Sequence, residues 1–180
     1  MQTIMHTISE NKTLVFNKPI TTPFLIPVIH ASTPNCVDNP FMVDGKSYGV
    51  TALSLGSPHG VVMVDNLDDI DVSKLGLSLG THPLFPKGAN IVFVQIMDKE
   101  ALKARLWPQD GSETAYTFEA ACAAGTAAMM LRKVSSGKIQ VCMGAHSFQV
   151  EWDKGEGDVR LTESRAEIGD DYVERTILYT

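Results

Sequence analysis

Short apolar runs, some alternating with polar residues, divide the chain into segments typical of strands. Residues 47–55 alternate only weakly, which favours a strand buried on both faces. In residues 147–152, Phe148, Val150 and Trp152 recur at every second position and so share one face. The pattern predicts strands at residues 13–16, 47–55, 60–65, 90–96, 103–107, 138–143, 147–152 and 159–162.

The segments between these runs carry turn and helix signals. Four prolines between residues 19 and 34 favour an extended region, and residues 35–45 are rich in turn-forming residues. Residues 68–78 begin with an acidic turn, which is typical of a short helix. Residues 98–101 and 155–157 suit turns between strands.

One long helix is predicted at residues 118–134. Thr117 can cap it, and Glu119 lies in its first turn, where the helix dipole favours negative charge. Residues 120–131 carry no charge on any face, which is typical of a buried helix, and Gly137 can end it in a left-handed conformation. Many short strands around one buried helix predict an α+β domain.

Composition narrows the class of protein. The 180 residues are 44% hydrophobic and 20% charged, which fits one globular domain or two very small ones. A net charge of −6 and a pI near 5.3 argue against nucleic acid or an anionic membrane as partner. No run is long and apolar enough for a transmembrane helix, and the first ten residues lack a signal-peptide pattern.

Three cysteines without CxxC spacing indicate reduced thiols in the cytoplasm. The five histidines lack metal-ligand spacing, so no metal site is expected.

The stretch from Gly111 to Cys122 carries the most specific motif. It resembles Gly-Glu-Thr-x-x-Cys-Gly-Thr/Ser-Gly-x-Cys, the helix-start motif of diaminopimelate epimerase and related cofactor-independent racemases. Glu113 and Thr114 match the motif, while Thr117 stands at the catalytic cysteine. Cys122 matches the second, non-catalytic cysteine, although on an Ala-rich face it also suits a buried apolar role.

Further blocks of the chain resemble the same family in the same order: residues 14–19, 54–65, 81–95 and 105–107, and the final strands. They correspond to the C-terminal half of the family's proteins, which have two similar domains. The resemblance implies a short lead at 1–12 and one domain at 13–180. Its fold would be a mixed or antiparallel sheet wrapped around a central buried helix at about 118–134.

The resemblance also implies a substrate site in amino-acid metabolism, with lysine biosynthesis as the family's setting. Thr117 would hold the catalytic position, and the substrate-binding candidates are Asn90, Ser57, His59, Glu113, Thr114, Phe118 and Glu119. Purely structural roles remain open for three of these residues: a helix cap for Thr117, a turn amide for Asn90 and a structural hydrogen bond for His59. Pro108-Gln109 replaces a Glu-Arg pair, which removes a bidentate carboxylate clamp.

The chemistry at the helix start departs from the family's reaction. Inverting an α-carbon without a cofactor needs a base on one face and an acid on the other, and a thiol at a helix start suits this role. The hydroxyl of Thr117 is barely ionised near neutral pH. Phe118 would crowd the substrate, and Glu119 would repel its carboxylate. The chain is therefore not expected to be active alone.

Three hypotheses about function follow. The chain is a subunit of a PLP-independent amino-acid epimerase or racemase, with a separate chain supplying the first domain. Alternatively, it is a homodimer with altered chemistry such as dehydration, or a catalytically inactive relative with a binding or regulatory role. Each predicts association, as a homodimer or as a heterodimer with a chain resembling the N-terminal half. A small amino-acid ligand is expected, and no cofactor, nucleic acid or membrane partner.

Overall fold

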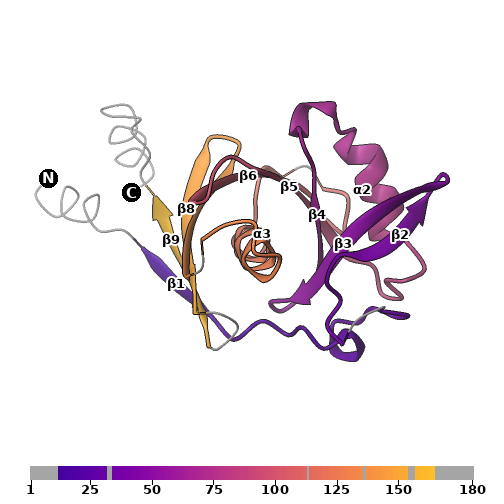
Figure 1. Cartoon of the computed structure of the whole chain (residues 1–180), viewed down its shortest axis with the longest axis horizontal. Coiled ribbons are helices and arrows are strands. Elements are labelled where there is room, and N and C mark those ends of the chain that lie inside the picture. Colours follow the sequence, from indigo (N-terminus) through magenta and orange to yellow (C-terminus); the bar gives the residue numbers. More distant parts are fainter. Residues whose placement is uncertain (1–11, 32–33, 113, 136, 154–156, 165–180) are drawn as a thin grey trace, which may run out of the picture.

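A computed structural model describes residues 12–31, 34–112, 114–135, 137–153 and 157–164, which form a single domain dominated by one sheet (Figure 1). The described helices are α2 (Val72–Gly80) and α3 (Phe118–Met130), with 3-10 turns η1 (Pro23–Leu25) and η2 (Leu67–Asp69). The strands are β1 (Thr13–Phe16), β2 (Asn39–Val43), β3 (Lys46–Ser54), β4 (Pro58–Met63), β5 (Asn90–Ile96), β6 (Ala101–Trp107), β7 (Gly137–Met143), β8 (His146–Trp152) and β9 (Val159–Ser164).

The nine strands form one mixed sheet in the order β1-β9-β8-β7-β6-β5-β4-β3-β2. Two neighbouring pairs are parallel, β4 with β5 and β6 with β7, and the other pairs are antiparallel. A parallel pair needs a crossover connection, and the two crossovers contain α2 and α3. The two helices pack on opposite faces of the sheet, so each face has its own apolar core. The mixed sheet expected from the sequence is confirmed.

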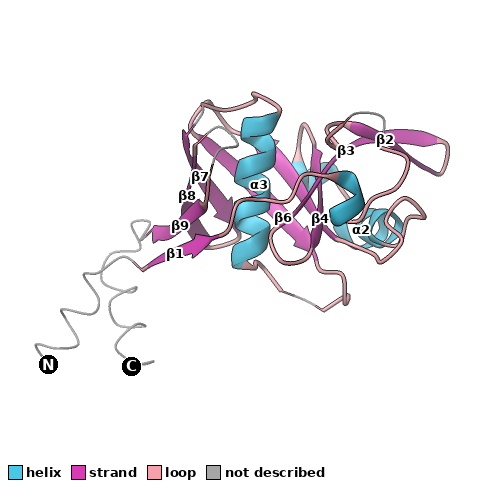
Figure 2. Cartoon of the chain, turned by 90° about the horizontal axis from the view of Figure 1, so that it is seen from below, coloured by secondary structure: helices cyan, strands magenta, loops and turns pink. Residues whose placement is uncertain are grey.

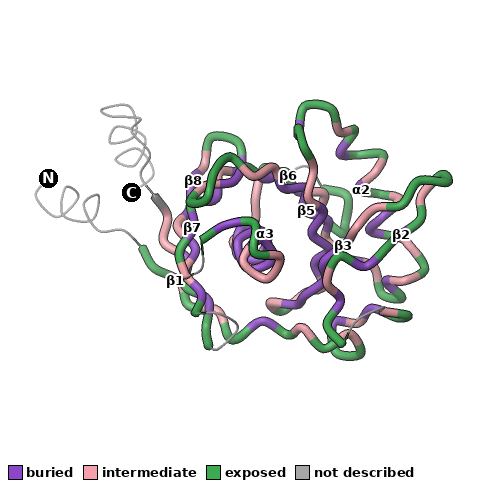
Figure 3. Tube along the Cα trace, viewed as in Figure 1, coloured by how far each residue is buried: buried purple, intermediate pink, exposed green. Residues whose placement is uncertain are grey.

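The composition of α3 explains how closely it packs against the sheet. Nine consecutive residues, 120–128, are buried, and they are mostly Ala. A Cβ added at Gly125 would approach Val150 Cγ1 to 3.0 Å and Ile139 Cγ2 to 3.1 Å. Small side chains therefore let the helix backbone approach β7 and β8, while the sheet curves around it (Figures 1 and 3). The hydroxyl of Thr126 donates to Cys122 O at 2.8 Å, which satisfies a buried polar group within the helix.

The predicted end of this helix was wrong. We expected it to reach residue 134 and to end at Gly137, but it ends at Met130. Arg132 adopts a left-handed conformation with φ of 56°, and its N–H donates to Met129 O at 3.0 Å. The N–H of Lys133 donates to Ala128 O at 3.0 Å, which completes a Schellman cap. A non-glycine residue thus ends the helix before the glycine is reached.

Two smaller predictions also need correction. The turn-rich region at residues 35–45 contains strand β2, in which Pro40 pairs with Gly49 of β3. Because β2 is an edge strand, its proline can lie where no ladder partner needs an N–H. The helix expected at 68–78 is split into η2 and α2, because the side chain of Asp71 accepts from Lys74 N and starts a new helix.

A connecting segment, residues 17–31, runs from β1 along the side of α3 that the sheet leaves open (Figure 2). Ile20 and Ser54 exchange two backbone hydrogen bonds of 2.9 Å, which fasten this connecting segment to the end of β3. Phe24, Leu25 and Ile29 of the same segment are exposed. Within the described part of the chain, neither helix is long and apolar enough to cross a membrane.

Candidate functional site

Three elements converge at the N-terminal end of α3. His59 near the start of β4 and Asn90 at the start of β5 are register partners, so they lie side by side. His59 alternates with Val61, and Asn90 with Val92, whose side chains pack in the core around α3. The charge of Glu119, in the first turn of α3, acts on His59. The sheet register therefore brings together His59 and Asn90, two of the residues that the sequence indicated, and α3, which carries Glu119 in its first turn, packs against both of their strands.

The amide of Asn90 joins the loops around this end. Its Nδ2 donates to Ser57 Oγ at 3.3 Å and to Pro58 O at 3.2 Å. Its Oδ1 accepts from the backbone N–H of Gln109 at 2.8 Å. The Gln109 side chain continues the network by donating to Lys87 O at 2.6 Å. Asn90 thus fixes three loops, and Ser57 is held within this hydrogen-bond network. The sequence interpretation of Asn90 as a turn amide that caps its own loop missed this bridging role.

His59 is the most enclosed polar side chain of the site, with an exposed fraction of 1%. Its Nδ1–H donates to the carbonyl oxygen of Ser57 at 2.9 Å, so the structural hydrogen bond expected for it is present. Burial lowers the pKa of His59, while the Ser57 carbonyl and the Glu119 charge oppose that shift. Its other ring nitrogen, Nε2, is buried and has no hydrogen-bond partner among the described residues.

Acid should destabilise the fold through His59. Its pKa lies below the ordinary 6.5 in the folded chain, so the unfolded chain takes up this proton first. The free energy of unfolding should fall by up to about 1.4 kcal/mol per pH unit as the pH drops from about 6.5 towards the lowered pKa. Above that range His59 should add no pH dependence.

Urea denaturation between about pH 8 and pH 5 measures this slope. His59→Gln should show a shallower slope than the unmodified chain below about pH 6.5. The same change at the exposed His30 is the control and should keep the original slope. Equal slopes for His59→Gln and the unmodified chain would contradict the assignment.

The start of α3 is held by Thr117. The backbone N–H of Ala120 donates to Thr117 Oγ1 at 3.0 Å, the geometry of a helix N-cap. The Phe118 ring packs against Tyr116 and Phe148, with centroids 5.7 and 6.0 Å away. Glu119 is half-buried, and no hydrogen bond or ion pair joins it to another described residue. The hydroxyl of Thr117 is thus engaged in the cap.

Removing the cap should weaken the whole domain modestly. We expect Thr117→Ala to lower the free energy of unfolding by about 1 kcal/mol, because one first-turn N–H loses its acceptor. Thr117→Ser keeps a hydroxyl at the same position and should retain most of the stability. Urea denaturation of the three proteins measures both values, and a Thr117→Ala chain as stable as the Ser variant would contradict the capping role.

The cysteines do not provide a reactive thiol at this end. Cys122 is buried within α3, where burial and the Glu119 charge raise its pKa. Burial raises the pKa of Cys36 to about 11, and this residue lies in the separate core on the α2 side of the sheet. Cys142 is half-buried in β7 next to Ser147, 3.8 Å from its Oγ. No group of three or more metal-ligating side chains occurs among the described residues.

Thr114 forms no hydrogen bond or ring contact with His59, Asn90 or Glu119 and lies beside another feature of the fold. It is exposed, and its hydroxyl donates to Tyr116 O at 3.1 Å. It also lines a cavity of about 510 Å³ between the start of α2 and the outer face of β6, together with Arg105 and Trp107. Glu113, the neighbouring candidate, lies outside the described residues.

An aromatic cluster that the sequence did not indicate borders the start of α3. The Tyr116 ring lies 4.2 Å from His146 and 5.2 Å from Phe148, measured between ring centroids. Gly144, in the β7–β8 turn, approaches Ala115. Sequence patterns give no signal for this contact, because it joins segments about 30 residues apart through the fold.

Comparison with known proteins identifies the family. Residues 51–168 match the family model described as diaminopimelate epimerase. The chain belongs to the diaminopimelate epimerase family. Diaminopimelate epimerase of Leptospira biflexa is 32% identical over 159 residues, covering 88% of this chain and 56% of that protein. The enzyme of Acetivibrio thermocellus is 35% identical over 145 residues, 81% of this chain and 51% of the relative. The chain spans about half the length of the curated relatives it matches.

Because the chain belongs to the diaminopimelate epimerase family, the N-terminal end of α3 can be compared with the family's helix-start motif. The sequence resemblance sets Thr117 against the motif's catalytic cysteine, and in the structure Thr117 caps its own helix. Glu119 stands where the motif has Thr or Ser, and it places a carboxylate in the first turn. The start of α3 in this domain thus carries a capping hydroxyl and a half-buried carboxylate.

Proposed function

We propose that this chain is the second-domain half of a PLP-independent amino-acid epimerase or racemase, working with a partner chain that supplies the first domain. Family membership and the half-length match to the curated epimerases support it. We also propose that α3 is the central helix of the family's domain, since it is buried and contacts strands β3 to β9. The substrate class follows the relatives' name: an amino acid related to diaminopimelate.

The observation that carries this proposal is the combination of a retained loop framework with a missing thiol. Asn90 fixes the loops around the α3 end through its amide. At the catalytic position, Thr117 offers a hydroxyl engaged as a cap, and Cys122 is buried. Such a domain can hold and orient a substrate, whereas the ionisable base for proton abstraction has to come from elsewhere.

A second candidate is a catalytically inactive relative with a binding or regulatory role. It is favoured by Glu119, whose carboxylate lies in the first turn of α3. In the family motif, the N–H groups of this turn would hold the substrate carboxylate, and a like charge there disfavours that binding. On this alternative, the site binds a ligand of different charge and does not convert it into a product.

Sedimentation velocity at micromolar concentration tests the partner requirement. The chain should sediment as a complex when mixed with a first-half chain encoded in the same genome, or as a homodimer when alone. The exposed Phe24 and Leu25 offer a variant test, since changing both to Ser should weaken an association that buries them. A stable monomer in both samples would rule out the association.

A further inference from the structure

The cavity of about 510 Å³ between β6 and the start of α2 has no role in the proposed function. Arg105 and Trp107 of β6 pair with Phe93 and Ile91 of β5, whose side chains belong to the core on the α2 side. Asn90 precedes Ile91 in β5 and so faces the opposite side of the sheet. The cavity therefore lies across the sheet from Asn90, and its volume is within the range typical of small-molecule sites.

Trp107 forms a fixed wall of this cavity. Gly76 of α2 lies directly against it, since a Cβ added there would approach Trp107 Cβ to 2.5 Å. A Cβ added at Gly111, in the loop after β6, would lie 3.9 Å from Trp107 Cζ2. The indole Nε1–H is not buried, and it has no hydrogen-bond acceptor among the described residues. The helix and the loop thus hold an accessible indole donor at the cavity.

Arg105 brings a positive charge to the same wall. Its side chain is exposed and lines the cavity, and no described residue forms an ion pair or a hydrogen bond with it. A guanidinium carries five N–H donors in a planar fork that matches a carboxylate. Together with the indole N–H of Trp107, Arg105 makes the β6 side of the cavity suited to a carboxylate.

Asp71 brings the opposite charge from the α2 side. Its Oδ1 caps α2 by accepting from Lys74 N at 3.2 Å and from Ser73 Oγ at 3.1 Å. These hydrogen bonds lower the pKa of Asp71, so the carboxylate is ionised near neutral pH. The second oxygen, Oδ2, has no donor among the described residues. Asp71 therefore keeps a free acceptor at the cavity, and it forms no ion pair with Arg105.

We propose that this cavity binds a free apolar amino acid, whose carboxylate lies at Arg105 and Trp107 Nε1 and whose ammonium lies at Asp71. The cavity carries one charge of each sign, and a zwitterion matches both. Ile70 and Pro108 also line the cavity and offer apolar surface to the ligand's side chain. The inference goes beyond the proposed function, because this second site lies across the sheet from Asn90 and needs no partner chain.

The two tryptophans give a direct readout on the chain alone. ¹⁵N labelling makes both indole N–H signals visible by NMR, and Trp107→Phe assigns them. The other indole, Trp152 Nε1, donates to Gly157 O at 3.2 Å and is the internal control. L-leucine should shift the Trp107 signal in a saturable manner and leave the Trp152 signal in place.

Two related probes separate the charges of the ligand. N-acetyl-L-leucine carries the carboxylate without an ammonium, and L-leucinamide carries the ammonium without a carboxylate. Each should bind about tenfold more weakly than L-leucine, because one charge-assisted hydrogen bond is lost.

Two variants assign each charge to its residue. Arg105→Gln should weaken L-leucine and N-acetyl-L-leucine about tenfold and leave L-leucinamide unchanged. Asp71→Asn keeps a capping oxygen for α2 while removing the charge. It should weaken L-leucine and L-leucinamide about tenfold and leave N-acetyl-L-leucine unchanged.

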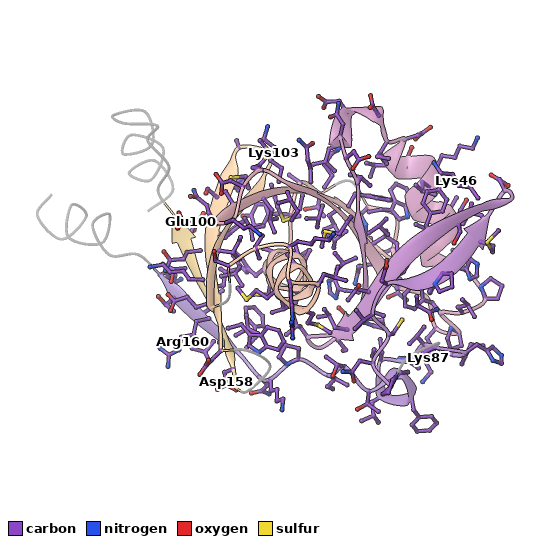
Figure 4. The ribbon with its side chains drawn as sticks, viewed as in Figure 1. Lys46, Lys87, Glu100, Lys103, Asp158 and Arg160 are labelled. Atoms are coloured by element: carbon purple, nitrogen blue, oxygen red, sulfur yellow. The ribbon has the colours of Figure 1, made fainter. Side chains whose placement is uncertain are left out.

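Matched controls exclude a general effect of charge. Arg160→Gln and Asp158→Asn make the same changes at exposed positions at the start of β9, on the side of the molecule away from α2 (Figure 4). Both should leave all three affinities unchanged. The well-dispersed NMR spectrum of each variant is the check that it is folded.

Several results would overturn the inference. The first is the absence of a saturable Trp107 shift with L-leucine, and the second is an equal shift of Trp152. Binding that depends on Arg105 and not on Asp71, or the reverse, would indicate a simple anion or cation site. Equal weakening by Arg105→Gln and Arg160→Gln would indicate unspecific attraction. None of these readouts involves association or turnover, so failure here is distinguishable from failure of the epimerase proposal.

Discussion

Phe148→Ala should lower the free energy of unfolding by about 3–5 kcal/mol. Phe148 is fully buried in β8, in the core that packs around α3, and its ring meets those of Tyr116 and Phe118. Truncation removes a large apolar side chain and leaves a cavity that the rigid sheet cannot close. The effect should extend to the start of α3, because Phe118 belongs to that helix.

Urea denaturation of Phe148→Ala and the unmodified chain measures this loss. Leu77→Ala is the control: this side chain of α2 is 53% exposed, so the change should stay within about 0.5 kcal/mol. A Phe148→Ala chain within about 1 kcal/mol of the unmodified protein would contradict the packing described for the α3 core.

Local patterns predicted most of the sheet, because each strand's apolar positions are set by its own burial. Strand β2 was missed for a specific reason: Pro40 and the surrounding Asn and Asp residues are typical of turns, yet an edge strand tolerates them. The parallel pairings of β4 with β5 and β6 with β7 depend on how crossovers pack, which a single run of residues does not encode.

The two ends of α3 also differ in how far a local sequence pattern predicts them. Thr117 was identified as a possible cap because the cap is a local interaction between residues three apart. The C-terminal end was misplaced because Arg132 adopts a positive φ, which is uncommon for a non-glycine residue. A pattern that expects glycine at such a position extends the helix too far.

The sequence indicated which residues belong to the candidate site, but it did not indicate how they are arranged in space. Family resemblance indicated His59, Asn90 and Glu119 one by one. The adjacency of His59 and Asn90 depends on the β4–β5 register, and the place of Glu119 depends on where α3 crosses the sheet. The unpartnered Nε2 of His59 and the bridging role of Asn90 appear only once these elements are in place.

The second large effect concerns catalysis at Thr117. We expect Thr117→Cys to give the chain no epimerase activity by itself, although it restores a thiol at the family's catalytic position. Under the proposed function the partner chain supplies the other half of the substrate site, so a thiol at residue 117 alone has no substrate held against it. The carboxylate of Glu119 also remains in the first turn, where it adds to the effect of burial in raising the pKa of the existing thiol Cys122. A new thiol beside it would meet the same negative charge.

Exchange of the α-proton of diaminopimelate in D₂O, followed by NMR, tests the central claim most directly. The assay compares the unmodified chain, Thr117→Cys, and Thr81→Cys as a thiol control at an exposed position. Each is measured alone and with a first-half partner chain. The account predicts no exchange above the protein-free rate for all three chains alone, and exchange once the partner supplies its thiol. Exchange by the unmodified chain or by Thr117→Cys in the absence of a partner would contradict it.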